Sequence, residues 1–192
     1  EANPESATPD RLSLLREAGV NRLSIGVQSL TENGLSFLGR PHDVREAERA
    51  LDAAQRAGFE RISLDLIYGY PGHDLDTWRG ELEHAARLGT GHVSAYCLTY
   101  EEGTPMAAWR DSGRISPLGE DEERLLLDET TRELANHGLE RYEISNYSQP
   151  GQESLHNLNY WMGGEYLGLG VSAHSHLGGV RSANERSLRR YL

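Results

Sequence analysis

The sequence predicts an α/β fold in which parallel strands and helices alternate to form a partial barrel. Four stretches of the chain share one layout: an amphipathic helix, a glycine suited to end it, two or three linking residues, and a short strand. The strands begin at Arg22, Arg61, His92 and Arg141, so their spacings are 39, 31 and 49 residues. Parallel strands need crossover connections of about a dozen residues or more, and helices usually supply them.

The individual elements carry ordinary start and stop signals. The expected strands cover residues 22–28, 61–67, 92–98 and 141–147, and each follows a glycine at position 19, 58, 89 or 138. The first helix is expected to start after Thr8, a good capping residue, with Pro9 in its first turn. Further helices are expected over 44–57, 77–88 and 119–137. In the last of these, the acidic residues 120–123 favour the positive end of the helix dipole and are read as a solvated helix start.

The two faces of the expected sheet differ in polarity. Leu23, Ile25 and Val27 would pack under the helices, whereas Ser24 and Gln28 lie on the opposite face, as Ser63 and Asp65 do in the next strand. An open sheet covered by helices on both sides is apolar on both faces. A partial barrel that holds a ligand needs polar groups facing its interior, and its site lies at the carboxyl ends of the strands.

Composition narrows the class of protein. At 192 residues, with 37% apolar and 26% charged residues, the chain is one domain or part of a larger one. The net charge of −11 and the pI of about 5.2 argue against nucleic acid and anionic membranes as partners. No apolar run approaches the roughly 18 residues of a membrane span, and no basic-then-apolar leader opens the chain, so a cytoplasmic location is expected. The first residue is Glu1 rather than Met, which suggests an internal piece of a longer protein.

Three polar residues are candidates for binding a ligand at the barrel mouth. Asp65 lies in mid-strand between two leucines, where an ionised carboxylate needs hydrogen bonds from a ligand or from a neighbouring backbone, Ser or Arg. Gln28 closes the first strand on the same face, and Arg40 follows in the loop above it. An arginine there can grip a carboxylate, although a lone surface arginine is more often only solvated.

The histidines near the end of the chain are a second candidate group. His174 and His176 are two residues apart, so they share one face of a strand, and two such histidines can hold a metal if a third ligand exists. His156 precedes Tyr160 and Trp161, and an imidazole beside large aromatic rings can ligate haem iron. Cys97 is the single cysteine, which excludes an internal disulfide and any metal site that uses two cysteines of this chain.

Several motifs together resemble a known family. The stretches 21–29, 38–42, 65–72 and 92–96 are similar to those of the radical S-adenosylmethionine (SAM) enzymes of the oxygen-independent coproporphyrinogen III oxidase family. The stretches 101–105, 141–146 and 156–161, the last being a complete His-Asn-x-x-Tyr-Trp pattern, look more like its haem-chaperone branch, HemW. The resemblance implies a partial (β/α) barrel whose N-terminal strands precede this chain and which uses SAM, a [4Fe-4S] cluster and haem.

The resemblance also implies roles for particular residues. The residues matching SAM contacts are Glu1, Gln28, Arg40, Asp65 and, with a backbone contact, Thr99. His156 matches the haem ligand of the chaperone branch. The family's Cys-x-x-x-Cys-x-x-Cys loop is absent, so this chain supplies no metal ligand for the [4Fe-4S] cluster, and catalytic residues are not assigned.

The resemblance also implies how the chain is organised and what the protein does. Residues 1–148 would form the C-terminal part of the barrel, and residues 149–192 a glycine- and aromatic-rich accessory segment that leads into the family's C-terminal region. The leading hypothesis is a haem chaperone that binds haem and delivers it to apo-haemoproteins. A membrane-associated acceptor is compatible with this hypothesis. One alternative is an oxygen-independent coproporphyrinogen III oxidase, which decarboxylates propionate side chains by a radical route. Another is a degenerate barrel that acts only as a binding module.

Overall fold

The computed structural model describes all 192 residues and divides into two compact units. Unit 1 comprises Glu1–Gln152, and unit 2 comprises Glu153–Leu192. No helix in either unit is both long and apolar enough to span a membrane.

A five-stranded sheet forms the centre of unit 1. Strands β1 (Arg22–Gln28), β2 (Arg61–Tyr68) and β3 (His92–Cys97) are parallel neighbours, and the sheet order is β1-β2-β3-β5-β4. The α/β class and the three parallel strands predicted from the sequence are confirmed.

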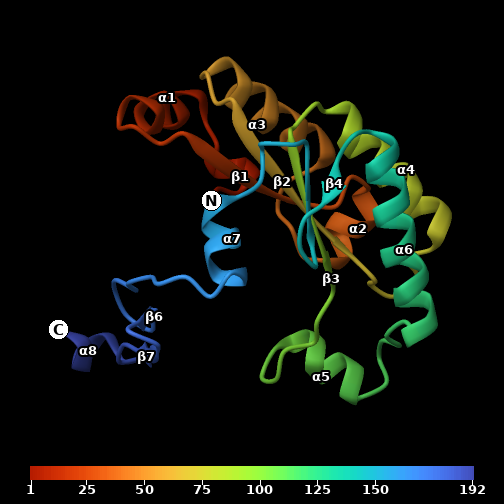
Figure 1. Cartoon of the computed structure of the whole chain (residues 1–192). Helices are drawn as coiled ribbons and strands as arrows, with labels where there is room; N and C mark the ends of the chain where they lie inside the picture. Colours follow the sequence, from red (N-terminus) through yellow and green to blue (C-terminus); the bar gives the residue numbers. More distant parts are fainter. The chain divides into compact units, whose positions relative to one another are not determined.

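Helices connect these strands and cover the outside of the sheet. The longer ones are α1 (Pro9–Glu17), α3 (Val44–Arg56), α4 (Leu75–Arg87) and α6 (Glu120–Asn136), and the shorter ones are η1 (Pro4–Ser6), α2 (Glu32–Phe37) and α5 (Pro105–Asp111). Figure 1 shows α3, α4 and α6 in succession along the outside of β1, β2 and β3. Helix α4 starts two residues before the predicted position because the side chain of Asp74 accepts a hydrogen bond from the backbone N–H of Thr77 and caps it.

The sheet has one apolar face and one polar face, as the alternation predicts. The side chains that pack beneath the helices are at most 4% exposed: Leu23, Ile25, Val27, Ile62, Leu64, Leu66, Val93 and Ala95. The opposite face carries Ser24, Ser63, Asp65 and Ser94. The hydrophobic core therefore lies between sheet and helices, and the inner face is left to polar groups.

The prediction of a fourth parallel strand over 141–147 was wrong. The segment forms a hairpin of β4 (Glu140–Arg141) and β5 (Asn146–Ser148), and β5 is antiparallel to β3. Between them, the carboxylate of Glu143 accepts hydrogen bonds from the backbone N–H of Ser145 and the side chain of Asn146. The bond from the Ser145 N–H takes up a backbone donor that would otherwise pair in a strand, and the chain turns back here.

Unit 2 is small and has little interior. It contains α7 (Leu155–Trp161), a hairpin of β6 (His174–Leu177) and β7 (Val180–Ala183), and the short helix α8 (Leu188–Tyr191). Ser154 and Ser175 are its only buried residues. Tyr166 pairs with His176 as an isolated bridge, which adds a third segment beside the hairpin.

Candidate functional site

Two adjoining cavities open on the inner face of the sheet in unit 1. The first has a volume of about 340 Å³, and its lining includes Glu1, Gln28 and Asp65. The second has a volume of about 320 Å³ and shares Gln28 and Asp65 with the first, while Tyr96 and Thr99 line its other side. Of the five residues expected to contact one ligand, these two cavities bring four together: Glu1, Gln28, Asp65 and Thr99.

Arg40 is the exception. It lines neither of these two cavities and lies between α2 and α3, where it is half-buried. Its Nε atom is buried and has no hydrogen-bond partner. A buried guanidinium N–H without a partner can donate a hydrogen bond to a ligand oxygen.

Asp65 is held by hydroxyl groups of neighbouring strands. Both of its carboxylate oxygens lie 2.9 Å from the Ser24 hydroxyl, and the Ser63 hydroxyl lies 3.4 Å from Oδ1. The possibility that a nearby serine satisfies this carboxylate is thus realised, and the cavity still exposes it to a ligand. Serine hydroxyls donate without adding charge, so Asp65 remains available for a ligand's ammonium or hydroxyl groups.

The electrostatic environment of Asp65 disfavours its ionised form. Burial raises the pKa of Asp65, while hydrogen bonds from Ser94 and Ser24 act in the opposite direction. The negative charge of Glu1 adds to the rise. A ligand that places positive charge or hydrogen-bond donors between the two carboxylates would offset their burial and mutual repulsion. A carboxyl group whose pKa is shifted in this way is typical of a binding site.

Gln28 adopts a strained backbone conformation at the end of β1. Its φ angle is +70°, in the left-handed region that side chains rarely adopt, and the pairing of β1 with β2 shifts between Ile25 and Gln28. A Cβ atom on Gly26 would lie 2.6 Å from Nε2 of Gln28, so only glycine leaves room for this amide. The bulge therefore aims the Gln28 side chain into the cavities, where strain of this kind often marks function.

The remaining two cavity residues lie at chain segments beside β1 and after β3. Ala2 pairs in parallel with Ile25, which places Glu1 alongside β1. Thr99 lies two residues after the end of β3 and is exposed, and the backbone N–H of Leu98 donates a hydrogen bond to the Tyr68 carbonyl at 2.8 Å. The loop that carries Thr99 is thus fixed to the end of β2.

A buried polar network behind the cavities was not predicted from the sequence. Glu81 of α4 is 2% exposed, and its carboxylate accepts hydrogen bonds from the Ser29 hydroxyl at 2.7 Å and from the Leu30 backbone N–H. Nε2 of His73 lies 3.2 Å from the same carboxylate. Glu81 therefore ties the loop after β1, next to Gln28, to the loop after β2. The signal in the sequence was a lone glutamate on the apolar stripe of α4 beside Trp78 and Leu82.

The chain's residues do not fit an iron–sulfur cluster. Cys97 is the only cysteine, and no group of three or more His, Cys, Asp or Glu residues is arranged to hold a metal ion. Burial raises the pKa of the Cys97 thiol to about 11, with Glu123 adding to the rise, whereas a cluster needs thiolates. His174 and His176 do share a strand, as predicted, but they gain no third ligand.

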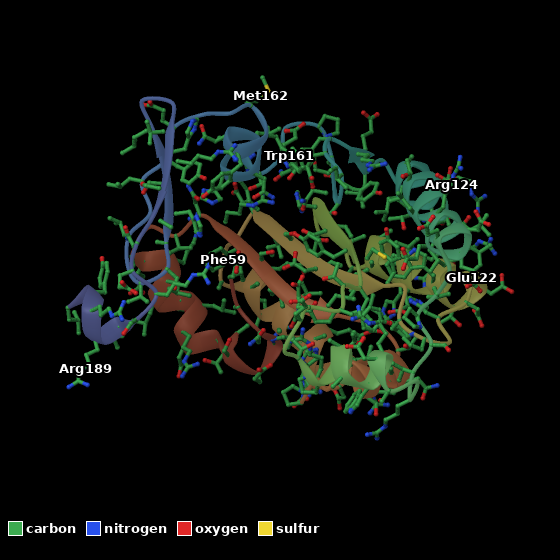
Figure 2. All side chains as sticks on the ribbon, turned by 90° about the horizontal axis from the view of Figure 1, so that it is seen from below. Phe59, Glu122, Arg124, Trp161, Met162 and Arg189 are labelled. Atoms are coloured by element: carbon green, nitrogen blue, oxygen red, sulfur yellow. The ribbon has the colours of Figure 1, made fainter.

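Unit 2 presents His156 within a group of aromatic rings. His156 and Tyr160 are four residues apart on α7, and their rings meet edge to face with centroids 4.8 Å apart. The Tyr166 ring follows at 4.4 Å from Tyr160. Trp161 and Met162 are 54% and 82% exposed, and Figure 2 shows the Met162 side chain extending away from the end of α7. An exposed imidazole with exposed apolar neighbours suits a flat, apolar ligand with a metal centre.

Several known proteins are similar to this chain in sequence. Residues 1–85 match the model of the "Radical SAM superfamily". The chain is 36% identical to "Heme chaperone HemW" of Bacillus subtilis over 192 residues, which are 100% of this chain and 51% of that relative. It is 40% identical to "Heme chaperone HemW" of Escherichia coli over 176 residues, which are 91% of this chain and 45% of that relative.

A solved structure matches nearly the whole chain. The coproporphyrinogen III oxidase HemN of Escherichia coli, described as a radical SAM enzyme, superimposes with a TM-score of 0.80 and 25% identity, covering 97% of this chain and 46% of that one. The chain thus spans about half the length of the relatives it matches. The family match, the HemW relatives and the HemN-like partial barrel lead to one conclusion: this chain belongs to the radical SAM superfamily.

Proposed function

We propose that the full-length protein containing this chain is a haem chaperone that binds SAM in unit 1 and haem in unit 2 and delivers haem to apo-haemoproteins. The observation that carries the proposal is His156, exposed on α7 and in ring contact with Tyr160, within the complete His-Asn-x-x-Tyr-Trp pattern. The curated HemW relatives, whose name is that of a haem chaperone, support the same assignment.

In unit 1, the residues suit SAM as a ligand. Glu1 and Asp65 offer carboxylates for the ribose hydroxyls and the ammonium group, and Gln28 offers an amide. Thr99 borders the neighbouring cavity, where its backbone would contact the ligand, and Arg40 would join the ligand through its unused Nε donor. When bound, SAM supplies the radical chemistry for which the superfamily is named, and a [4Fe-4S] cluster would need ligands from outside this chain.

In unit 2, the residues suit haem. The imidazole of His156 would ligate the iron, because a neutral ring nitrogen is a common axial ligand. Tyr160 and Trp161 offer exposed aromatic surface for the porphyrin face. Because these residues are exposed on one short helix, the ligand would be held loosely enough to be handed to another protein.

A second function has a specific observation in its favour. The TM-score of 0.80 to HemN supports an oxygen-independent coproporphyrinogen III oxidase. In that case the porphyrinogen propionates would react at the SAM site in unit 1, and His156 would have no role with iron.

One pair of assays on the reconstituted full-length protein separates the two functions. We expect transfer of bound haem to an apo-haemoprotein, followed by the absorbance of the acceptor, and no decarboxylation of coproporphyrinogen III in the presence of SAM and a reductant. Decarboxylation without haem transfer would replace the chaperone with the oxidase. Neither activity, together with no SAM binding, would leave the binding-module alternative.

A further inference from the structure

A row of hydrogen-bonded side chains crosses the polar face of the sheet and ends at Asp65. In the register of the parallel strands, Ser24 lies opposite Ser63, and Ser63 lies opposite His92. His92 is 2% exposed, and nothing in the ligand site described above uses it. A buried imidazole in this position requires a structural or functional reason, because both of its ring nitrogens must find partners.

Three contacts connect this row, and the one that reaches Asp65 is the longest. The Tyr142 hydroxyl lies 2.8 Å from Nε2 of His92, and Nδ1 of His92 lies 2.7 Å from the Ser63 hydroxyl. The Ser63 hydroxyl in turn lies 3.4 Å from Oδ1 of Asp65. Tyr142 belongs to the turn between β4 and β5, so the row reaches from the hairpin to the candidate SAM site.

The Ser63 hydroxyl has one proton and three neighbours that can accept it: Oδ1 of Asp65 at 3.4 Å, the Ser94 hydroxyl at 3.3 Å and Nδ1 of His92 at 2.7 Å. When Ser63 donates to Asp65, the directions of the other bonds in the row follow. An ionised Asp65 accepts only, so Ser63 is the donor in the bond between them. Ser63 then accepts from Nδ1–H of His92, which leaves Nε2 to accept from the Tyr142 hydroxyl. This arrangement needs a neutral imidazole, and burial, with Arg22 adding to the effect, lowers the pKa of His92 to about 3.

We propose that His92 and Tyr142 are positioning residues of the SAM site, which orient the Ser63 hydroxyl toward Asp65 and so hold this carboxylate as a fixed acceptor for the ligand. The proposal rests on the proposed binding of SAM by Asp65. It gives a role to the hairpin segment around Tyr142, which replaces the fourth parallel strand.

The charged groups around Asp65 determine how losing this row of hydrogen bonds would change the pH dependence of SAM binding. Glu1 and Tyr96 face Asp65 as acidic groups, and Arg22 faces it as a cation. The hydrogen bonds from serine hydroxyls are what lower the pKa of Asp65 against its burial. If Ser63 loses its orientation, the pKa of Asp65 rises further. As the pH is lowered, the carboxylate is then protonated earlier, and SAM binding that needs it is lost at a higher pH than in the wild type.

The test uses SAM itself as the probe in equilibrium dialysis with the cluster-reconstituted full-length protein, between pH 5 and pH 8. His92→Leu removes both ring nitrogens, whereas His92→Asn keeps an amide N–H where Nδ1 stands. Because one oriented hydrogen bond to a charged group is lost, we expect His92→Leu to weaken SAM binding about tenfold and to move its loss to higher pH. His92→Asn should recover most of this affinity, and Tyr142→Phe should lower it about twofold.

The matched control is His84→Leu on α4, where the imidazole is partly exposed and pairs with Glu48. It should leave SAM binding and its pH profile unchanged. Equal SAM affinities for His92→Leu and His92→Asn would overturn the proposal, whether both match the wild type or both are weak. If His92→Leu does not fold, an unchanged affinity and pH profile in Tyr142→Phe would overturn it as well.

Asp65→Ala separates failure of this proposal from failure of the SAM site. If Asp65→Ala binds SAM like the wild type, the SAM site itself is misplaced. If Asp65→Ala loses affinity while the His92 and Tyr142 variants do not, the SAM site stands and the positioning role is wrong.

Discussion

The two units of this chain are built on different physical principles. Unit 1 buries a continuous apolar core between its sheet and helices, whereas unit 2 leaves large apolar side chains in solvent. Those at least 60% exposed in unit 2 are Leu155, Met162, Leu167, Leu169, Val180, Leu188 and Leu192. A unit with so little interior gains its order mainly from hydrogen bonds, such as those that pair β6 with β7.

The units also differ in charge. Of the chain's 19 basic and 30 acidic side chains, four and three lie in unit 2, so unit 1 carries a net charge of −12 and unit 2 a net charge of +1. Haem carries two anionic propionates, and arginines pair well with carboxylates. The charge distribution therefore favours haem in unit 2 over unit 1, in agreement with the assignment of His156.

The difference in packing predicts the largest effect. Leu64 is fully buried beneath the helices, so Leu64→Ala should lower the free energy of unfolding by about 2–5 kcal/mol through lost burial and a cavity. The matched change in unit 2, Leu169→Ala, removes a side chain that is 82% exposed and should alter it by less than about 0.5 kcal/mol. Denaturant unfolding of the full-length protein measures both. Equal losses would mean that Leu169 is packed and that the contrast between the units is false.

The difference in ligands predicts the next effect. Asp65→Ala removes the carboxylate shared by both cavities, and SAM affinity in the full-length protein should fall about tenfold or more. Haem affinity should stay within about twofold, because the proposed haem ligand, His156, lies in unit 2. Asp76→Ala on α4, which changes a carboxylate that is 92% exposed, is the control. Equal loss of both ligands on changing Asp65 would point to a structural role for this residue.

The raised pKa of Asp65 predicts a smaller effect on stability. Because its folded-state pKa is raised, the ionised carboxylate destabilises unit 1 at neutral pH, and this cost disappears below the ordinary value of 3.8, where the unfolded chain is protonated too. The neutral variant Asp65→Asn should therefore melt at a higher temperature than the wild type at pH 7, with the gap closing toward pH 3. A variant that is less stable at pH 7 would contradict the account. Thermal melts across this pH range supply the measurement.

The regular part of unit 1 was predictable because local patterns determine it. Alternating apolar residues in β1 and β2, with a glycine before each strand, identify strands whose partners follow after a helix. Asp65 was recognisable as a candidate because a carboxylate between two leucines breaks that pattern. Its serine partners share the inner face by the same period of two.

The features missed from the sequence depend on long-range contacts. Glu81 meets Ser29 and Leu30 across about 50 residues of chain, so no local pattern identifies it as the tie between two loops. The segment 141–147 has the composition of a strand, but the carboxylate of Glu143 bonds the backbone N–H of Ser145, and the segment forms a hairpin. His92 was placed correctly on a strand, but its bond to Tyr142 required the position of that hairpin.

The most direct test of the chaperone assignment is a haem titration of the reconstituted full-length protein followed by its Soret band. Wild type should bind haem in a stoichiometric amount, and His156→Ala should shift or abolish the band without changing SAM affinity. The matched control His137→Ala removes an imidazole of unit 1 that pairs with Glu133, and its band should be unchanged. A His156→Ala spectrum identical to that of the wild type would contradict the ligand role of His156, and with it the central claim.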